Sequence, residues 1–466
     1  MANVVVNYDG SITTTPLELV SPNSVAQIQA ILRDTTAYPS PVRAKGSYHS
    51  LTPCVSSDGT IVDMSAMAQV VQIDKPNNVF TAQAGMQIID ASKALRKQGL
   101  QFMTNIEIGN MTLGSAACCH SKDALDGIQY GQFGSYVTGI KWVTPAGELA
   151  EASAAVHPEL LPLMRGSYGL AGIIYEVTLQ VKPIEALHFT YTPRSVDELT
   201  QADVDQYMQA EGLICWTVGR TSVFQQRQKV ADTNILSSLE ASAREHLWNF
   251  GGAFAGHIID TFLTDKSLRD AVQNGAFDFT KFLYSTLHLT GGITILAPAK
   301  TIDYRETPAA AKYAFTFWAF PSGQWLDTMR AYLDFADQHF QTTGFRCNMP
   351  LGAYHIRQDT NSILSYTYDE EIFSIDPIHA VTDAAAWAAF LVAFNDFAAQ
   401  RGGKPLLNQS PFVQRAHVEA AYGQRWFDLV KWLRTMDPQQ RMVNQYFASL
   451  MGSPTPSAAP GTSQAS

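Results

Sequence analysis

Hydrophobic and polar residues alternate with two different periods along the first 183 residues. After Ser24, a favourable helix N-cap, apolar residues recur at the spacing of one helix face; they are Val25, Ile28, Ile31 and Leu32. A second helix is predicted over 88–98, with Gly99 ending it, and a third over 159–166. Runs rich in β-branched residues predict strands over 41–46, 60–67, 78–86, 135–148 and 172–183. This region is therefore expected to be an α+β unit.

A second α+β pattern follows, with longer helices. Strands are predicted over 186–194, 312–321, 352–359 and 362–371, and helices over 238–250, 267–289, 324–340 and 383–403. The apolar stretch 247–263 is too short and too polar to span a membrane, and we expect a buried helix there. Three short helical pieces are expected within 411–450. We therefore divide the chain into 1–183, 184–410, 411–451 and a disordered tail at 452–466.

Length and composition exclude several classes of protein. A chain of 466 residues exceeds the size of one hydrophobic core, which favours more than one domain. The net charge is −10 and no block of Lys and Arg stands out, so nucleic acid is not an expected partner. The five cysteines are scattered, and Cys118 and Cys119 are adjacent, which predicts neither a disulfide framework nor a metal site. With no signal peptide, we expect a soluble, cytoplasmic protein that does not bind membranes.

Three glycine-containing loops are the candidate chemistry of the first region. They are Arg43-Ala44-Lys45-Gly46-Ser47-Tyr48-His49-Ser50, then Gly109-Asn110-Met111-Thr112-Leu113-Gly114-Ser115, and Arg165-Gly166-Ser167-Tyr168-Gly169-Leu170-Ala171-Gly172-Ile173-Ile174. Glycine lets the backbone approach a ligand closely, and successive N–H groups in such a turn bind phosphate. Each loop alone is equally typical of an ordinary turn. Their order within one domain favours a common ligand.

These segments resemble the vanillyl-alcohol oxidase, or PCMH-type, FAD-binding flavoprotein superfamily. The resemblance rests on GSYHS, TLGS, VTPAGE and RGSYGLAGII in that order, and covers roughly 20–183. The C-terminal sequence with a DP turn before Asn444 also resembles a superfamily segment that folds back onto the flavin domain. The resemblance implies a two-subdomain PCMH-type FAD-binding domain and an α+β cap with a mostly antiparallel sheet.

The resemblance also implies which residues bind FAD. They are Arg43, Ala44, Lys45, Gly46, Ser47, Tyr48, His49, Ser50, Thr112, Leu113, Gly114, Ser115, Gly172, Ile174 and Asn444. His49 lies where many members link a histidine to the 8α-methyl carbon of the flavin. A second, cysteinyl link is not expected, because Gly109 and Asn110 occupy its place.

The implied reaction is the oxidation of a small molecule by FAD, with O2 or another acceptor reoxidising the flavin. Polar residues of the cap strands make Tyr354, Arg357 and Tyr366 the candidate catalytic residues, with His355 on the opposite face of its strand. An alcohol, an amine or a related carbon is the expected substrate. A sugar-alcohol or aldonolactone oxidase is the alternative, although those enzymes tend to have an R-P-H-W-G-K run. Here the aligned residues are Lys404-Pro405-Leu406-Leu407-Asn408-Gln409, so the lysine that ends the run is absent. A flavin-binding protein or redox-complex subunit without turnover is a further alternative.

Overall fold

A computed structural model describes residues 3–124, 129–231, 266–289, 291–305 and 307–452. The helices predicted over 238–250 and 247–263 and the tail after residue 452 lie outside these ranges. The described part is a mixed α and β fold in which antiparallel strand pairs predominate, as predicted. No helix within the described ranges has the length and apolar character needed to cross a membrane.

A small parallel sheet lies near the N-terminus. Its strands follow the order β3 (Glu18–Val20), β5 (Thr60–Asp63) and β4 (Val42–Lys45). The predicted helix is α1 (Val25–Arg33), and the Ser24 side chain accepts a hydrogen bond from the Gln27 amide as its N-cap. A hairpin of β1 (Val5–Val6) and β2 (Thr13–Thr14) precedes this sheet. Because β4 ends at Lys45, the GSYHS loop leaves the sheet at its carboxyl edge.

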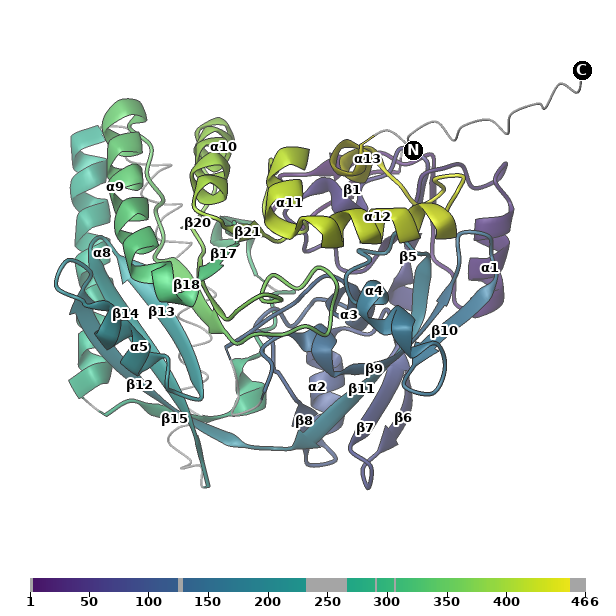
Figure 1. Cartoon of the computed structure of the whole chain (residues 1–466), viewed down its shortest axis with the longest axis horizontal. Helices are drawn as coiled ribbons and strands as arrows, with labels where there is room; N and C mark the ends of the chain where they lie inside the picture. The colour runs from purple at the N-terminus through teal and green to yellow at the C-terminus, as the bar shows by residue number, and fades with distance from the viewer. Residues whose placement is uncertain (1–2, 125–128, 232–265, 290, 306, 453–466) are drawn as a thin grey trace, which may run out of the picture.

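The second sheet is antiparallel and forms the right-hand side of Figure 1. Its order is β10 (Leu149–Ser153), β9 (Val137–Val143), β11 (Ile173–Pro183), β7 (Val79–Gln83) and β6 (Val70–Asp74), and β8 (Leu100–Phe102) also pairs with β11. The helices here are α2 (Ile88–Arg96), α3 (Leu113–Cys118) and α4 (Leu161–Met164), with 3-10 turns at Pro53–Val55, Met64–Ala66, Phe133–Tyr136 and Pro158–Leu160. Strand β6 was not predicted from the sequence.

The third sheet, on the left of Figure 1, has eight strands among the described residues. Their order is β15 (Ile293–Leu296), β12 (Ala186–Ser195), β14 (Thr221–Val230), β13 (Gly212–Val218), β18 (Leu351–Ile356), β19 (Ile372–Ile375), β17 (Trp318–Pro321) and β21 (Lys404–Pro405). Around it lie α5 (Gln201–Tyr207), α8 (Lys266–Leu289), α9 (Trp325–Thr343) and α10 (Ala384–Gln400), 3-10 turns at Ala297–Lys300, Ala309–Ala311 and Ser322–Gln324, and the pair β16 (Ala314–Phe315) and β20 (Ile378–His379).

The strand predicted over 362–371 is wrong. This segment consists of turns and bends, and the strand that pairs with β18 is β19, which begins at Ile372. The polar side chains of this segment form hydrogen bonds with a distant part of the sequence. Gln132 Nε2 donates to Ser365 Oγ at 2.8 Å and to Thr367 Oγ1 at 2.9 Å. These bonds satisfy buried side-chain amide and hydroxyl groups.

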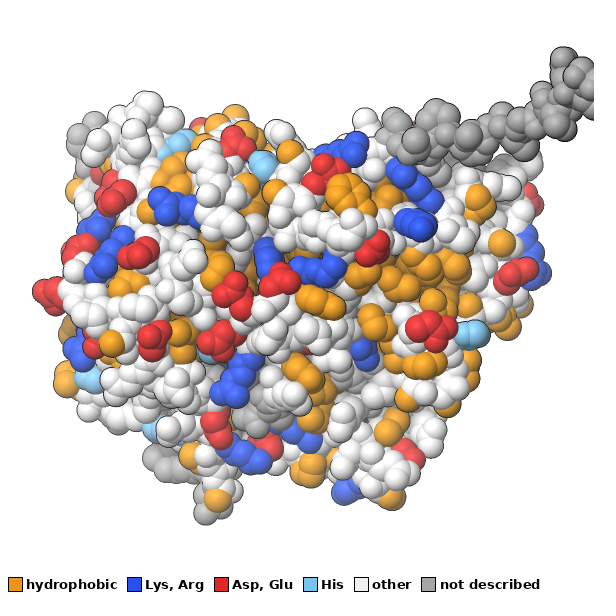
Figure 2. Space-filling view, in the orientation of Figure 1, with side chains coloured by type: hydrophobic (Ala, Val, Ile, Leu, Met, Phe, Trp, Pro, Cys, Tyr) orange, Lys and Arg blue, Asp and Glu red, His pale blue; other side chains and the backbone are white. Residues whose placement is uncertain are grey.

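The C-terminal segment returns to the N-terminal part of the chain. Its helices are α11 (Arg415–Tyr422), α12 (Gln424–Met436) and α13 (Gln445–Met451), which cross the top of Figure 1 toward the N-terminus. The Val42 amide donates to the Arg441 carbonyl at 2.7 Å, and the Arg441 guanidinium donates to the carbonyls of Ile31 and Leu32. The surface on this side carries acidic and basic side chains interspersed with each other (Figure 2).

Candidate cofactor and substrate site

Two of the predicted glycine loops line one small cavity. It contains about 410 Å³ of empty space, and its lining residues are Gly46, Ser47, Tyr48, His49, Ser50, Val55, Met111, Thr112, Ser115, Cys119, Asn408 and Gln409. The fold thus brings together two loops that are far apart in the sequence. It also places Asn408 and Gln409, which follow β21, beside them. We refer to it as the cofactor cavity.

Close backbone packing holds the two loops together. A Cβ atom on Gly46 would lie 2.8 Å from Thr112 Cγ2, and closer still to Thr112 Oγ1, so glycine is required at this position. Ser47 Oγ donates to the Asn110 carbonyl, and Gln87 Nε2 donates to Ser47 Oγ at 3.2 Å. The two loops therefore pack closely against each other beside the cavity.

His49 faces this cavity with two buried ring nitrogens that have no hydrogen-bond partner. Its ring stacks on Tyr8, with the ring centroids 3.9 Å apart, and meets Tyr304 edge-on. Burial lowers its pKa to about 3, and the nearby Lys312 ammonium acts in the same direction. The imidazole is therefore neutral, and an unpartnered buried nitrogen of this kind fits a site where a ligand completes its bonding. The residues present thus fit a bound flavin.

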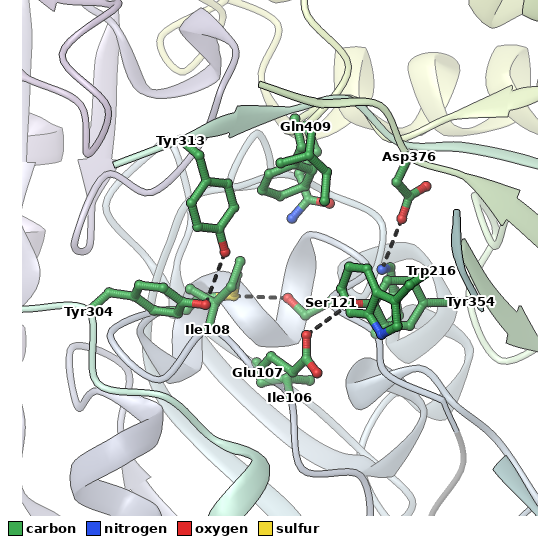
Figure 3. Close-up of a pocket in the computed structure, with 14 residues that line it drawn as sticks. Ile106, Glu107, Ile108, Ser121, Trp216, Tyr304, Tyr313, Tyr354, Asp376 and Gln409 are labelled. Atoms are coloured by element: carbon green, nitrogen blue, oxygen red, sulfur yellow. Dashed lines mark hydrogen bonds and ion pairs between the residues drawn. The ribbon is translucent and has the colours of Figure 1, made fainter. Parts of the chain in front are cut away.

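A larger cavity adjoins the first. It contains about 650 Å³ of empty space, and its lining residues are Ile106, Glu107, Ile108, Met111, Ser121, Lys122, Trp216, Tyr304, Tyr313, Phe315, Tyr354, Asp376, Ile378 and Gln409. Met111 and Gln409 line both cavities. Figure 3 shows the hydrogen-bonded pair Tyr304 and Tyr313 on one side and Tyr354 and Asp376 on the other. We call it the substrate cavity.

A cluster of charged and polar groups lies in the otherwise aromatic wall of the substrate cavity. Tyr354 donates from its hydroxyl to Glu107 Oε2 at 2.8 Å. Lys122 Nζ lies 3.2 Å from the centre of the Tyr354 ring and 3.5 Å from Asp376 Oδ2. Burial raises the pKa of Asp376 to about 7 and lowers that of Lys122. The cluster therefore contains two carboxyl groups, Glu107 beside a hydroxyl and Asp376 beside an ammonium group.

Several residues predicted to bind FAD hold the loops from behind, and their contact with FAD stays a prediction. The buried Arg43 guanidinium donates to four backbone carbonyls, which belong to Cys54, Tyr168, Gly169 and Met442. Ala44 packs in the core beside α1, and Lys45 forms an ion pair with Asp63 at 2.6 Å. Asn444 caps α13 and donates to the carbonyls of Pro53 and Ser56. None of these four side chains lines either cavity.

The remaining predicted FAD residues lie in the framework around the loops. Leu113 is fully buried in the main core, and Gly114 packs against Ala84. Gly172 has φ +130°, and a Cβ there would collide with the Val143 carbonyl, while Ile174 is buried in β11. Their contact with FAD stays a prediction, since neither cavity includes them.

Of the three predicted catalytic residues, the structure places Tyr354 in the wall of the substrate cavity. Arg357 is exposed just beyond the end of β18. Tyr366 is buried against Phe317, with the ring centroids 5.0 Å apart, and does not line the cavity. His355 lies on the other face of β18 from Tyr354, with Nε2 at 3.4 Å from Glu371.

Sequence reasoning did not single out Glu107, Lys122 or Asp376. A signal existed for the first of them, because a glutamate flanked by Ile106 and Ile108 is a charge in an apolar run. Cys119, interpreted as a packing residue, also lines the cofactor cavity, and its sulfur lies 3.7 Å from that of Cys118.

Comparison with known proteins identifies the cofactor domain. Residues 16–153 match the family model described as an FAD binding domain. L-gulono-1,4-lactone dehydrogenase of Mycobacterium tuberculosis is 27% identical over 39% of this chain and 41% of that protein. L-gulonolactone oxidase of Scyliorhinus torazame is 24% identical over 43% of this chain and 45% of that protein. The chain thus matches less than half the length of these curated relatives.

Solved structures match over nearly the whole chain. The crystal structure of cholesterol oxidase from B. sterolicum has a TM-score of 0.70 with 13% sequence identity and covers 97% of both chains. A solvent-stable cholesterol oxidase has a TM-score of 0.72 with 15% identity over the same share. At this identity the likeness concerns the fold. Residues 16–153 therefore match an FAD-binding domain, and the whole described fold is like that of the cholesterol oxidases.

Proposed function

We propose that this protein is an FAD-dependent oxidoreductase that oxidises a small organic substrate in the substrate cavity. In this proposal residues 1–183 bind the cofactor, 184–410 form the cap, and 411–451 return to the cofactor domain. When bound, FAD supplies the acceptor for a hydride from substrate carbon, and O2 or another acceptor reoxidises it. The observation that carries the proposal is that Met111 and Gln409 line both cavities, so a ligand in one faces a ligand in the other.

We further propose that His49 forms a covalent bond to the flavin. Its unpartnered, buried and neutral imidazole supports this, because a neutral ring nitrogen is the nucleophilic form of the side chain. The test is acid precipitation of the purified protein, followed by a spectrum of the washed pellet. Flavin should remain in the wild-type pellet and be lost from His49→Ala. The matched control is His157→Ala, at an exposed histidine. Release of flavin from the wild type by acid would contradict the link.

The walls of the substrate cavity favour a substrate with an apolar body. Trp216, Tyr313 and Phe315 supply much of this wall, and aromatic surface binds apolar groups. Sterols are one such class, and the structural neighbours are named cholesterol oxidases. Aldonolactones are the second candidate, because the curated relatives are named for them. The test is to compare an apolar secondary alcohol such as a sterol with an aldonolactone, reading peroxide formation and dye reduction in parallel. Exclusive turnover of the lactone would reverse our preference.

A further inference from the structure

A chain of buried charges lies behind the wall of the substrate cavity. Asp123 Oδ2 lies 2.8 Å from Lys300 Nζ, and Asp123 Oδ1 lies 3.0 Å from Arg227 Nη1. The side chains of all three residues are 0% exposed. Burial opposes ionisation of Asp123, but the two cations overcome it and hold its pKa below the ordinary value. We call Lys300, Asp123 and Arg227 the buried charge chain.

The buried charge chain leads to Glu107. Arg227 Nη2 lies 3.8 Å from Glu107 Oε1, and the other oxygen of the same carboxylate accepts the hydrogen bond from Tyr354. The Glu107 side chain is 17% exposed and lines the substrate cavity, so it is the one member of this series that a substrate reaches. The Arg227 guanidinium is further fixed by bonds to Gln225 Oε1.

Backbone pairing connects the two ends of this arrangement. The Ile302 amide donates to the Glu107 carbonyl at 2.8 Å, and Lys300 lies two residues before Ile302. Arg227 comes from β14 of the eight-stranded sheet, whereas Asp123 and Glu107 precede β9. Two segments therefore hold Glu107: Arg227 of β14 contacts its carboxylate, and Ile302 contacts its carbonyl.

Two cations lie near the Glu107 carboxylate. One is Arg227, and the other is Lys122, because Glu107 acts on the pKa of Lys122. Among the described residues, the hydroxyls of Tyr354 and Tyr304 also interact with it. Cations and hydroxyl donors are the partners that suit a carboxylate.

We propose that Glu107 is the catalytic base and that the residues of the buried charge chain are positioning residues that hold its carboxylate in place. The proposal rests on the proposed oxidoreductase function. For an alcohol, the O–H bond breaks, its proton goes to a carboxylate oxygen of Glu107, and its electron pair forms the carbonyl bond as the C–H pair leaves as hydride. With FAD bound, the oxidised flavin would accept this hydride and be reduced. Tyr354 stays in place as the hydroxyl that orients the carboxylate.

The decisive variant is Arg227→Met, because Asp123 keeps its pair with Lys300 and no unbalanced charge remains at that carboxylate. Loss of a cation this close raises the pKa of a carboxylate by about 1–3 units. The acidic limb of the pH profile of kcat/KM should therefore move up by about 1–3 pH units. Arg227→Lys should return the acidic limb to its wild-type position, since this substitution keeps the positive charge. The matched control is Arg220→Met, at an arginine whose side chain is 38% exposed and which should leave the profile unchanged. An unmoved limb in folded, flavin-containing Arg227→Met overturns the proposal.

A second measurement needs no Arg227 variant. Glu107→Gln should lose about 100- to 10,000-fold in kcat. A Glu107→Gln protein that binds FAD and keeps the wild-type kcat would overturn the proposal. If wild-type protein binds no FAD and oxidises nothing, the proposed function fails, whereas an active enzyme with an unmoved limb refutes only this inference.

Discussion

The contact between Gly46 and Thr112 provides a quantitative test of the cofactor cavity. In Gly46→Ala the new methyl group would lie 2.8 Å from Thr112 Cγ2 and 3.1 Å from Thr112 Cβ, distances at which the neighbour must move. Relief of this clash should move apart the two loops that line the cavity. The free energy of FAD binding should therefore become less favourable. Overpacking of this size costs about 1–3 kcal/mol. At 1.4 kcal/mol for each factor of ten, FAD binding should weaken about 5- to 150-fold.

A double-mutant cycle isolates this contact from other effects. Thr112→Ala removes both colliding atoms and also the hydrogen bond from Thr112 Oγ1 to Ser115 Oγ, which contributes about 0.5–1.5 kcal/mol. In Gly46→Ala/Thr112→Ala the clash is gone, so the double variant should bind FAD better than the sum of the single effects implies, by about 1–2 kcal/mol. The assay is quenching of flavin fluorescence on titration of apoprotein. All variants carry His49→Ala, which makes binding reversible if His49 is the covalent link.

The matched control for this cycle is Gly323→Ala. A Cβ on Gly323 meets nothing within 4 Å, and the residue lies in a 3-10 turn at the start of α9. This variant should bind FAD within twofold of its parent, or about 0.4 kcal/mol. A coupling free energy near zero between Gly46 and Thr112 would refute the packing argument. So would a Gly46→Ala protein that binds FAD as tightly as its parent.

Three further predictions concern other parts of the molecule. Tyr354→Phe removes the hydrogen bond to the Glu107 carboxylate, which contributes about 1.5–3 kcal/mol. The value of kcat/KM should therefore fall about 10- to 150-fold. The control Tyr332→Phe, in a buried part of α9, should change kcat/KM little. Asn444→Ala removes the α13 cap, and calorimetry should show a loss of about 1–2 kcal/mol in unfolding free energy. The folded pKa of Asp376 is about 7, above its unfolded value, so the stability that its protonated form contributes is present at low pH and lost as pH rises through about 7. As the pH rises from about 5 to about 8, Asp376→Asn should therefore lose less thermal stability than the wild type does. An equal loss in the two proteins would contradict this assignment.

Local patterns predicted most of the secondary structure because the causes of those elements are local. The Ser24 cap, the helical spacing after it and the stop at Gly99 all lie within a few residues of the elements they define. The strand predicted over 362–371 failed because its polar side chains bond to Gln132, more than 200 residues away, and no local pattern distinguishes such bonds from a solvent-facing strand.

The motif residues near FAD show a second limit of sequence reasoning. A motif identifies residues that belong to one function, but it does not separate those that touch the ligand from those that hold the loop. Arg43 stands close to the GSYHS loop in sequence, yet its guanidinium binds the carbonyls of Tyr168 and Met442, which other segments supply. Such long-range bonds decide its role and cannot be deduced from the order of residues in the loop.

The meeting of these charged residues in the substrate cavity could not be predicted for the same reason, and together they constrain the substrate. Glu107, Lys122 and Asp376 come from three segments that meet only in the folded chain. Glu107 is matched by Arg227 and Asp376 by Lys122, so the wall offers a charged ligand no unpaired partner. A charged substrate would lose its hydration without compensation there, whereas a neutral one with a hydroxyl exchanges one hydrogen bond for another. Because sterols and aldonolactones are both neutral, discrimination between them falls to the aromatic wall, and replacing Trp216 by alanine should weaken binding of the apolar substrate more than that of the lactone.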